Sequence, residues 1–209
     1  MTFGIHHFEL FLTAGILLNL TPGPDTVYIL GRSLAQGRRA GIASALGIAT
    51  GSIFHTFAAA LGLSAILAAS AWAFRVVKLV GGAYLIFLGI KMFVHRQKAL
   101  NLPSNFRSST TYAAFRQGFL TNLLNPKVAL FFLAFLPQFI DPNSTAKVVA
   151  FLALGLTFVT TGTIWCLVLA WFASGLSEKL RENPTIAELL NRAVGSLFVF
   201  LGARLATTK

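Results

Sequence analysis

The chain has 209 residues, of which 56% are apolar and only 11% are charged, and its mean hydropathy is +0.73. A soluble domain carries about 25% charged residues, so the composition excludes an ordinary soluble domain and predicts an all-α integral membrane protein. The net charge of +11 does not predict a nucleic-acid binder. The basic residues lie mainly at the ends of apolar runs, where they anchor helices to anionic lipid.

The first apolar run, residues 8–30, is interrupted by Thr21-Pro22-Gly23-Pro24-Asp25. Proline removes a backbone donor and breaks a helix, and backbone groups freed inside a membrane need partners from protein or water. No Lys or Arg precedes Arg32, so we expect no signal peptide and a first helix that stays in the mature protein. A broken helix that carries a carboxylate is typical of a transport site.

Six apolar runs reach the length of about 20 residues that a membrane span requires: 8–30, 41–67, 76–94, 119–140, 148–174 and 186–205. The second run is expected to continue as a small-residue reentry that ends near Trp72. The one clear polar loop covers residues 95–116. Most Lys and Arg residues fall on the side of this loop, so the positive-inside rule places it in the cytoplasm and both termini outside it.

The chain also contains an internal similarity. A match at an offset of 103 residues joins Gly15-Ile16-Leu17-Leu18-Asn19-Leu20 to Gly118-Phe119-Leu120-Thr121-Asn122-Leu123. When the offset is changed by one residue, Pro24-Asp25 aligns with Pro126-Lys127. The third and sixth runs match at an offset of 113. Each half has three spans, and because this number is odd, the second half starts on the opposite side of the membrane from the first. The sequence therefore predicts a single domain, 1–209, of two inverted three-helix repeats, 1–94 and 117–209, with broken first and fourth helices.

Each break is expected to start a half-helix near the middle of the membrane, with Pro24 or Pro126 in its first turn. A helix N-terminus carries roughly half a positive charge, and its unpaired N–H groups suit a substrate carboxylate. Lys127 opposes this dipole, and a charge at the centre of a membrane helix costs about 2.5–3.5 kcal/mol. We therefore expect Asp25 to bind a substrate ammonium, Lys127 to bind its carboxylate, and the two residues to pair in the empty site.

Simpler roles compete with these. Asp25 can serve only to cap its helix, and Lys127 can be a snorkelling residue packed toward a loop. The polar candidates for substrate contact are Asn19, Thr21, Asn122 and Asn125, and for each of them we expect instead that the side chain satisfies backbone groups freed by the breaks. The other candidates are Pro22, Gly23 and the two prolines that start the half-helices, Pro24 and Pro126.

The remaining polar residues point to no further chemistry. His55 can titrate during transport, but a packing role is expected for it, and Trp165 and Cys166 are expected to line helices or touch lipid. A single cysteine and four scattered histidines predict no disulfide, metal site or cofactor.

Three segments resemble signatures of the lysine exporter / resistance to homoserine and threonine (LysE/RhtB) family. They are Asn19–Asp25, the Asn125-Pro126-Lys127 motif with Phe131–Phe139 after it, and Gly81-Gly82-Ala83-Tyr84-Leu85 with Leu88-Gly89. The resemblance covers the whole chain in length and in its six apolar runs. It implies a bacterial inner-membrane exporter of amino acids or close derivatives, driven by proton antiport without ATP, and it leaves the cargo open.

We therefore predict secondary-active export by alternating access, in which protonation of Asp25 on the outer side releases the substrate ammonium. The expected partners are the amino acid, protons and the lipid bilayer, without nucleic acid, and the oligomeric state stays open, a homo-oligomer included. The alternatives are an exporter of another small metabolite, a non-transporting scaffold, a passive channel and a membrane-embedded enzyme. The enzyme would need a convergent nucleophile, base or metal set, and none stands out.

Overall fold

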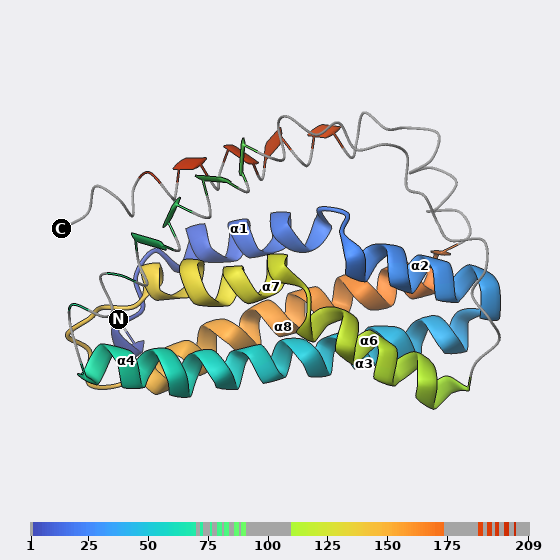
Figure 1. The fold of residues 1–209 in the computed structure, drawn as a ribbon, viewed down its shortest axis with the longest axis horizontal. Coiled ribbons are helices and arrows are strands. Elements are labelled where there is room, and N and C mark those ends of the chain that lie inside the picture. Colours follow the sequence, from blue (N-terminus) through green and yellow to red (C-terminus); the bar gives the residue numbers. More distant parts are fainter. Residues whose placement is uncertain are drawn as a thin grey trace.

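The computed structural model describes residues 2–69 and 110–173, with scattered residues between 72 and 90 and between 188 and 203. Within these stretches every element is helical, apart from one isolated β-bridge between Ile5 and Ile140. The helices lie roughly along the long axis of the molecule (Figure 1). This arrangement confirms the all-α prediction.

The first apolar run forms two helices, α1 (Phe8–Leu20) and α2 (Pro24–Gln36), which follow a short 3-10 turn, η1 (Thr2–Gly4). The predicted break lies between them, at residues 21–23. The second helix continues past residue 30, where we expected the span to end, and stops before Gly37. That glycine has a φ of 81°, which glycine adopts at little cost, and it reverses the chain sharply into the next helix.

The second run forms α3 (Arg38–Ala58), which continues through a π-helical turn, η2 (Ala59–Leu63), into α4 (Ser64–Ala69). Its stretch Arg38–Ile66 is long and apolar enough to cross a membrane. The span predicted at 41–67 is therefore confirmed. The reentry predicted to end near Trp72 lies almost wholly outside the described residues.

The fourth run forms α6 (Thr111–Leu123), α7 (Pro126–Leu130), the π-helical turn η3 (Phe131–Phe135) and the 3-10 turn η4 (Leu136–Phe139). The chain bends by 47° at the break between α6 and α7. Helix α6 starts before the predicted residue 119, because the Thr110 side chain accepts a hydrogen bond from the Ala113 N–H at 3.2 Å and caps the helix start.

The fifth run forms α8 (Lys147–Trp171), close to the predicted 148–174. Among the described residues two helices can each cross a membrane, Arg38–Ile66 and Lys147–Trp171, and the bent pair that includes α6 adds a third crossing if it is one span. Helix α1 is apolar but shorter.

The third and sixth predicted runs lie mostly outside the described residues, so the count of six spans stays a prediction. Where they are described, the two runs lie against each other. A Cβ atom on Gly89 would lie 2.6 Å from the Gly195 carbonyl oxygen. Glycine at such a contact lets two membrane helices approach to backbone distance.

Helices α3 and α6 also cross at backbone distance. A Cβ atom on Gly47 would lie 2.0 Å from the Phe115 carbonyl oxygen, and one on Gly118 would lie 2.5 Å from the Ser44 carbonyl oxygen. Small residues at the crossing are what close packing of helices in lipid requires. This contact fixes α6, and so the second break, against α3.

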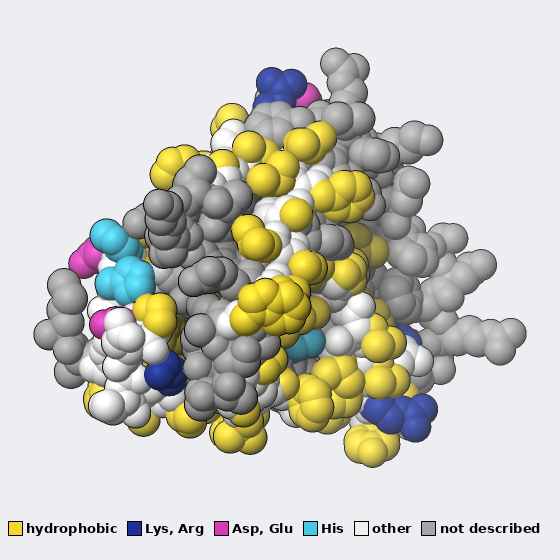
Figure 2. Space-filling view, turned by 60° about the vertical axis from the view of Figure 1, so that its left-hand side comes forward, with side chains coloured by type: hydrophobic (Ala, Val, Ile, Leu, Met, Phe, Trp, Pro, Cys, Tyr) yellow, Lys and Arg dark blue, Asp and Glu magenta, His cyan; other side chains and the backbone are white. Residues whose placement is uncertain are grey.

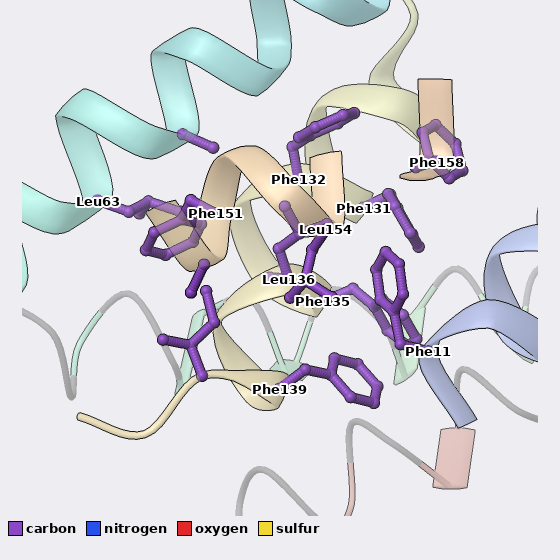
Figure 3. Close-up of a cluster of buried hydrophobic side chains, with 14 of the residues drawn as sticks. Phe11, Leu63, Phe131, Phe132, Phe135, Leu136, Phe139, Phe151, Leu154 and Phe158 are labelled. Carbon is purple, nitrogen blue, oxygen red and sulfur yellow. The ribbon is translucent and has the colours of Figure 1, made fainter. Parts of the chain in front are cut away.

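A cluster of phenylalanine side chains fills the space between α1, η3, η4 and α8 (Figure 3). The Phe131 ring lies 4.2 Å from that of Phe158 and 4.8 Å from that of Phe135, and Phe11 packs edge-on against Phe139 at 5.4 Å. Offset and edge-on contacts of this kind stabilise aromatic pairs beyond the area they bury. The aromatic motif after the second break is therefore core.

Large apolar side chains also cover much of the described surface (Figure 2). Leu61 and Leu124 are 64% and 77% exposed, and Phe54, Phe57 and Ile164 are more than half exposed. A soluble monomer rarely exposes contiguous apolar patches larger than a few hundred Å². In this chain such a surface fits contact with lipid.

Candidate functional site

The two helix breaks lie next to each other inside the molecule. The Asn122 side chain, one residue from the end of α6, donates a hydrogen bond from Nδ2 to Oδ2 of Asp25 in the first turn of α2, at 2.8 Å. Asn122 is almost wholly buried. A charge-assisted bond of this kind is roughly twice as strong as one between neutral groups, so it holds the two breaks in register.

Lys127 lies close to the first break but not on Asp25. Its Nζ atom donates to the carbonyl oxygens of Leu18 at 2.7 Å and of Thr21 at 2.8 Å. These carbonyls lie at the C-terminal end of α1, where a helix leaves its last carbonyls unpaired and carries partial negative charge. The ammonium therefore acts as a cap for α1.

The direct pair between Asp25 and Lys127 that we expected in the empty site is not formed in the described structure. The physical reason is that the break itself supplies acceptors for the ammonium, namely the carbonyl oxygens of Leu18 and Thr21. The prediction had assumed that only a carboxylate could accept its hydrogen bonds. Both residues nevertheless lie on the wall of the same cavity.

Asn122 connects Asp25 to α3 as well. Ser52 donates a hydrogen bond from Oγ to Oδ1 of Asn122 at 3.1 Å, and Nε2 of His55 lies 3.3 Å from its main-chain oxygen. The His55 ring also stacks on Phe132, with ring centroids 5.8 Å apart. The packing role expected for His55 is thus seen, together with a contact to the main chain next to the second break.

Local capping explains how each half-helix begins. Pro24 and Pro126 each stand in the first turn, preceded by extended backbone at Gly23 and Asn125. The Asn125 side chain accepts a hydrogen bond from the Lys127 N–H at 3.1 Å and caps α7. The residue before α2 is Gly23, which has no side chain that could cap this helix start.

The side chains of the other two polar candidates, Thr21 and Asn19, bond to different parts of the chain. Thr21 donates from Oγ1 to the Leu17 carbonyl at 2.7 Å, and the same carbonyl also accepts the Thr21 N–H at 3.1 Å. Asn19 donates to Oγ1 of Thr161 at 3.2 Å and ties α1 to α8. For Asn19 and Asn122 the side-chain hydrogen bonds are to other side chains, and the roles expected for them in transport stay predictions.

These residues surround one cavity of about 40 Å³. Seven predicted site residues line it: Asn19, Thr21, Gly23, Asp25, Asn122, Asn125 and Lys127. Pro22, Pro24 and Pro126 do not line it and act through the shape of the backbone. This volume is room for a few waters, so a larger ligand requires the surrounding helices to move apart.

The cavity has walls that the sequence-based argument did not assign to the site. Ser52 comes from α3, and Thr163, Trp165 and Cys166 come from α8. These residues lie within long regular spans without a break or a charge nearby, and only the small residues next to them, such as Gly51 and Gly162, mark close packing. Trp165 and Cys166, which were expected to be ordinary lining, therefore belong to the site.

The wall of the cavity is partly polar and partly apolar. Asp25 and Lys127 carry opposite charges on it, and its apolar residues include Leu18, Ile48, Val128, Phe158 and Val159. Among the described residues no group of three His, Cys, Asp or Glu side chains is placed to hold a metal ion. The site therefore offers ionic and hydrogen-bonding groups beside an apolar wall.

Comparison with known proteins gives relatives along the full chain. Residues 16–209 match the family described as LysE type translocator. An uncharacterised membrane protein of Vibrio cholerae serotype O1 is 34% identical over 205 residues, 98% of each chain. A leucine efflux protein of Klebsiella pneumoniae subsp. pneumoniae is 30% identical over 205 residues, which cover 98% of this chain and 97% of the relative. No solved structure matches the chain.

The match to the family over nearly the whole length agrees with the broken helices, the apolar surface and the charged cavity. It also indicates a transporter of small molecules, embedded in a membrane, and not an enzyme. The chain belongs to the LysE type translocator family.

Proposed function

We propose that this protein exports an amino acid from the cytoplasm by proton antiport. The observation that carries the proposal is the pair of helix breaks joined by Asn122 and Asp25, with Lys127 on the same cavity. Such a site offers a carboxylate to an ammonium group, and a lysine beside a helix start to a carboxylate. A free amino acid carries both of these charges.

The substrate that fits this cavity best is an amino acid with an uncharged, apolar side chain. Among the described residues that line it, Asp25 is the one acid, and these residues offer no second carboxylate to an ammonium or guanidinium on the substrate side chain. The apolar residues on the wall, among them Ile48 of α3 and Phe158 and Val159 of α8, suit a branched hydrocarbon instead. The leucine efflux protein among the relatives agrees with this choice.

The two halves are proposed to be inverted repeats, residues 1–94 and 117–209. Helices α1 and α6 both have 13 residues, and their bounds correspond at the offset of 103 residues that the internal similarity indicates. Each is followed by a proline-started half-helix. In Figure 1, α1 and α2 run in the opposite direction to α6 and α7, as inverted halves require.

The cavity lies between two sets of contacts, and alternating access would open one set at a time. On the side of the α2 C-terminus, Tyr28 donates to the Ala114 carbonyl at 2.9 Å and Arg32 donates to Gln117 of α6. On the other side, His6 and Asp141 form main-chain hydrogen bonds with Phe139 and Gly4. In the proposed cycle, opening toward the cytoplasm requires the Tyr28 and Arg32 contacts to part.

Asp25 is the proposed coupling residue. Protonation from the outer side would neutralise its carboxylate and weaken its hold on the substrate ammonium, and deprotonation on the cytoplasmic side would restore it. The chain would then sit in a bacterial inner membrane with both termini in the periplasm. The described basic residues at the turn between α2 and α3, Arg38 and Arg39, support this orientation.

Uptake into inside-out membrane vesicles with an acidic interior tests the proposed function. In such vesicles an exporter moves substrate inward while protons leave. We expect labelled leucine to accumulate at least tenfold above vesicles without the protein, and a protonophore to abolish the difference. Leucine flux that does not depend on the proton gradient would indicate a channel. No flux of any amino acid from correctly folded protein would indicate another metabolite or a scaffold.

A further inference from the structure

Two buried polar atoms without a hydrogen-bond partner lie on residues of the same cavity. Among the described residues, the buried side-chain atoms of this kind are Oδ1 of Asp25, Nε1 of Trp165, and the hydroxyls of Ser33 and Ser64. Of these four residues, only Asp25 and Trp165 line the cavity. A buried polar group without a partner costs free energy, so such a group at a binding site is one that a ligand can satisfy.

The two atoms have opposite chemistry. A carboxylate oxygen only accepts hydrogen bonds, whereas an indole N–H only donates them. Asn122 already donates to Oδ2 of Asp25, and Asn125 interacts with the same carboxylate, but Oδ1 accepts no well-formed hydrogen bond. The cavity therefore presents one buried acceptor and one buried donor that have no hydrogen-bond partner in the described structure.

Several other donors around the cavity already make hydrogen bonds within the protein. Lys127 uses two of its three N–H bonds on the carbonyls of α1, Thr21 bonds to Leu17, and Ser52 bonds to Asn122. Trp165 is different, because its ring packs against the buried cluster that includes Leu30, Ala45 and Ile48 while its N–H meets no acceptor. The ring is thus held in place with a free donor.

We propose that Trp165 is a substrate-binding residue whose indole N–H donates a hydrogen bond to the carboxylate of the transported amino acid. This inference rests on the proposed function. An amino acid with an apolar side chain carries one donor group, its ammonium, and one acceptor group, its carboxylate. The ammonium satisfies Oδ1 of Asp25, and the carboxylate satisfies Nε1 of Trp165 beside the third N–H bond of Lys127. The substrate then fills both vacancies at once.

Trp165→Phe tests this by removing the N–H and keeping an aromatic ring. The binding of leucine and of isopentylamine, which is leucine without its carboxylate, is measured on the purified full chain in detergent micelles. We expect the dissociation constant for leucine to increase at least tenfold and that for isopentylamine to change less than twofold. Trp171→Phe, the same change at an exposed position of α8, is expected to leave both constants unchanged.

An unchanged ratio of the two dissociation constants in Trp165→Phe would overturn the inference while leaving the proposed function intact. Failure of the unaltered protein to bind any amino acid would instead remove the proposed function, and the inference with it. The two failures are therefore distinguishable.

A second measurement does not depend on changing Trp165. The chain has three tryptophans, and Trp72 and Trp171 are both exposed. In the variant Trp72→Phe/Trp171→Phe, the fluorescence of the remaining Trp165 is expected to respond to leucine in a saturable way and not to isopentylamine. No response to leucine, under conditions where binding is shown by the labelled ligand, would overturn the proposal.

Discussion

Lys127 shows how one residue can serve both the fold and the site. Its ammonium binds the carbonyls of Leu18 and Thr21, which the break after α1 leaves without helical partners. In the core of a lipid bilayer no water is available to donate hydrogen bonds to such carbonyls. The same ammonium lies on the wall of the cavity and adds positive charge there.

Replacing Lys127 with Met tests this structural role. Met retains much of the apolar stem but leaves two carbonyls unpaired, and an unsatisfied buried acceptor costs about 1–3 kcal/mol. We expect a lower midpoint of thermal unfolding in detergent micelles. Lys147→Met, at the start of α8, serves as the control and is expected to keep the original midpoint. Equal midpoints for the two variants would mean that the ammonium does not stabilise the break.

Some residues of the site were predictable from sequence and others were not. Asp25 and Lys127 stand out because charge is rare inside an apolar run, and the prolines beside them mark the breaks. Ser52 and Trp165 carry no such mark. They join the site only because α3 and α8 pack across the breaks, and that packing is a long-range property that no local pattern shows. The missing Asp25–Lys127 pair has the same origin, since the competing carbonyls come from α1.

At the scale of elements, the site depends on where α6 lies against α3. The backbones of the two helices touch at Gly47 and Gly118, and Asn122, one turn beyond Gly118, reaches Asp25. A Cβ on Gly51 would lie 2.8 Å from Oδ1 of Asn122. The glycines of α3 therefore set the distance at which the two breaks can meet.

Gly47→Ala is expected to destabilise the protein, because the added methyl would meet the Phe115 carbonyl, which is backbone and cannot swing away. Overpacking of this kind costs about 1–3 kcal/mol. Gly62→Ala is the matched control, since a Cβ there meets nothing within 4 Å, and in a helix alanine is favoured over glycine by about 0.5–1 kcal/mol.

Thermal unfolding of both glycine variants under identical conditions tests whether Gly47 permits the close contact between α3 and α6. A lower midpoint for Gly47→Ala and an equal or higher midpoint for Gly62→Ala are the expected results. A Gly47→Ala protein as stable as the original would show that α3 and α6 are not packed this closely.

Element boundaries followed the sequence where a specific residue sets them. Pro24 and Pro126 begin their half-helices as predicted, because proline fixes the helix start. The ends of the spans were less accurate: α2 continues to Gln36 and α6 begins at Thr111. There hydropathy alone places the boundary at the last apolar residue, whereas a glycine turn or a threonine cap decides where the helix stops or starts.

For the whole molecule, the proposed orientation predicts which ends face which compartment. Asn143→Cys, on the exposed turn before α8, and Ala35→Cys, near the exposed end of α2, can be introduced with Cys166→Ser, which removes the native buried thiol. A membrane-impermeant thiol reagent is expected to label Cys at 143 in intact cells, and Cys at 35 only after permeabilisation. The reverse pattern would invert the proposed topology.

The central claim is that the cluster at the two breaks couples proton movement to substrate export through Asp25. The most direct measurement compares leucine accumulation in acid-interior, inside-out vesicles for the original protein, Asp25→Asn and Glu9→Gln. Glu9 is an exposed acid in the first turn of α1 and serves as the matched control. At equal amounts of protein in the membrane, we predict that Asp25→Asn lowers gradient-dependent accumulation at least tenfold and that Glu9→Gln leaves it unchanged. Gradient-driven accumulation by Asp25→Asn at the original rate would contradict the account.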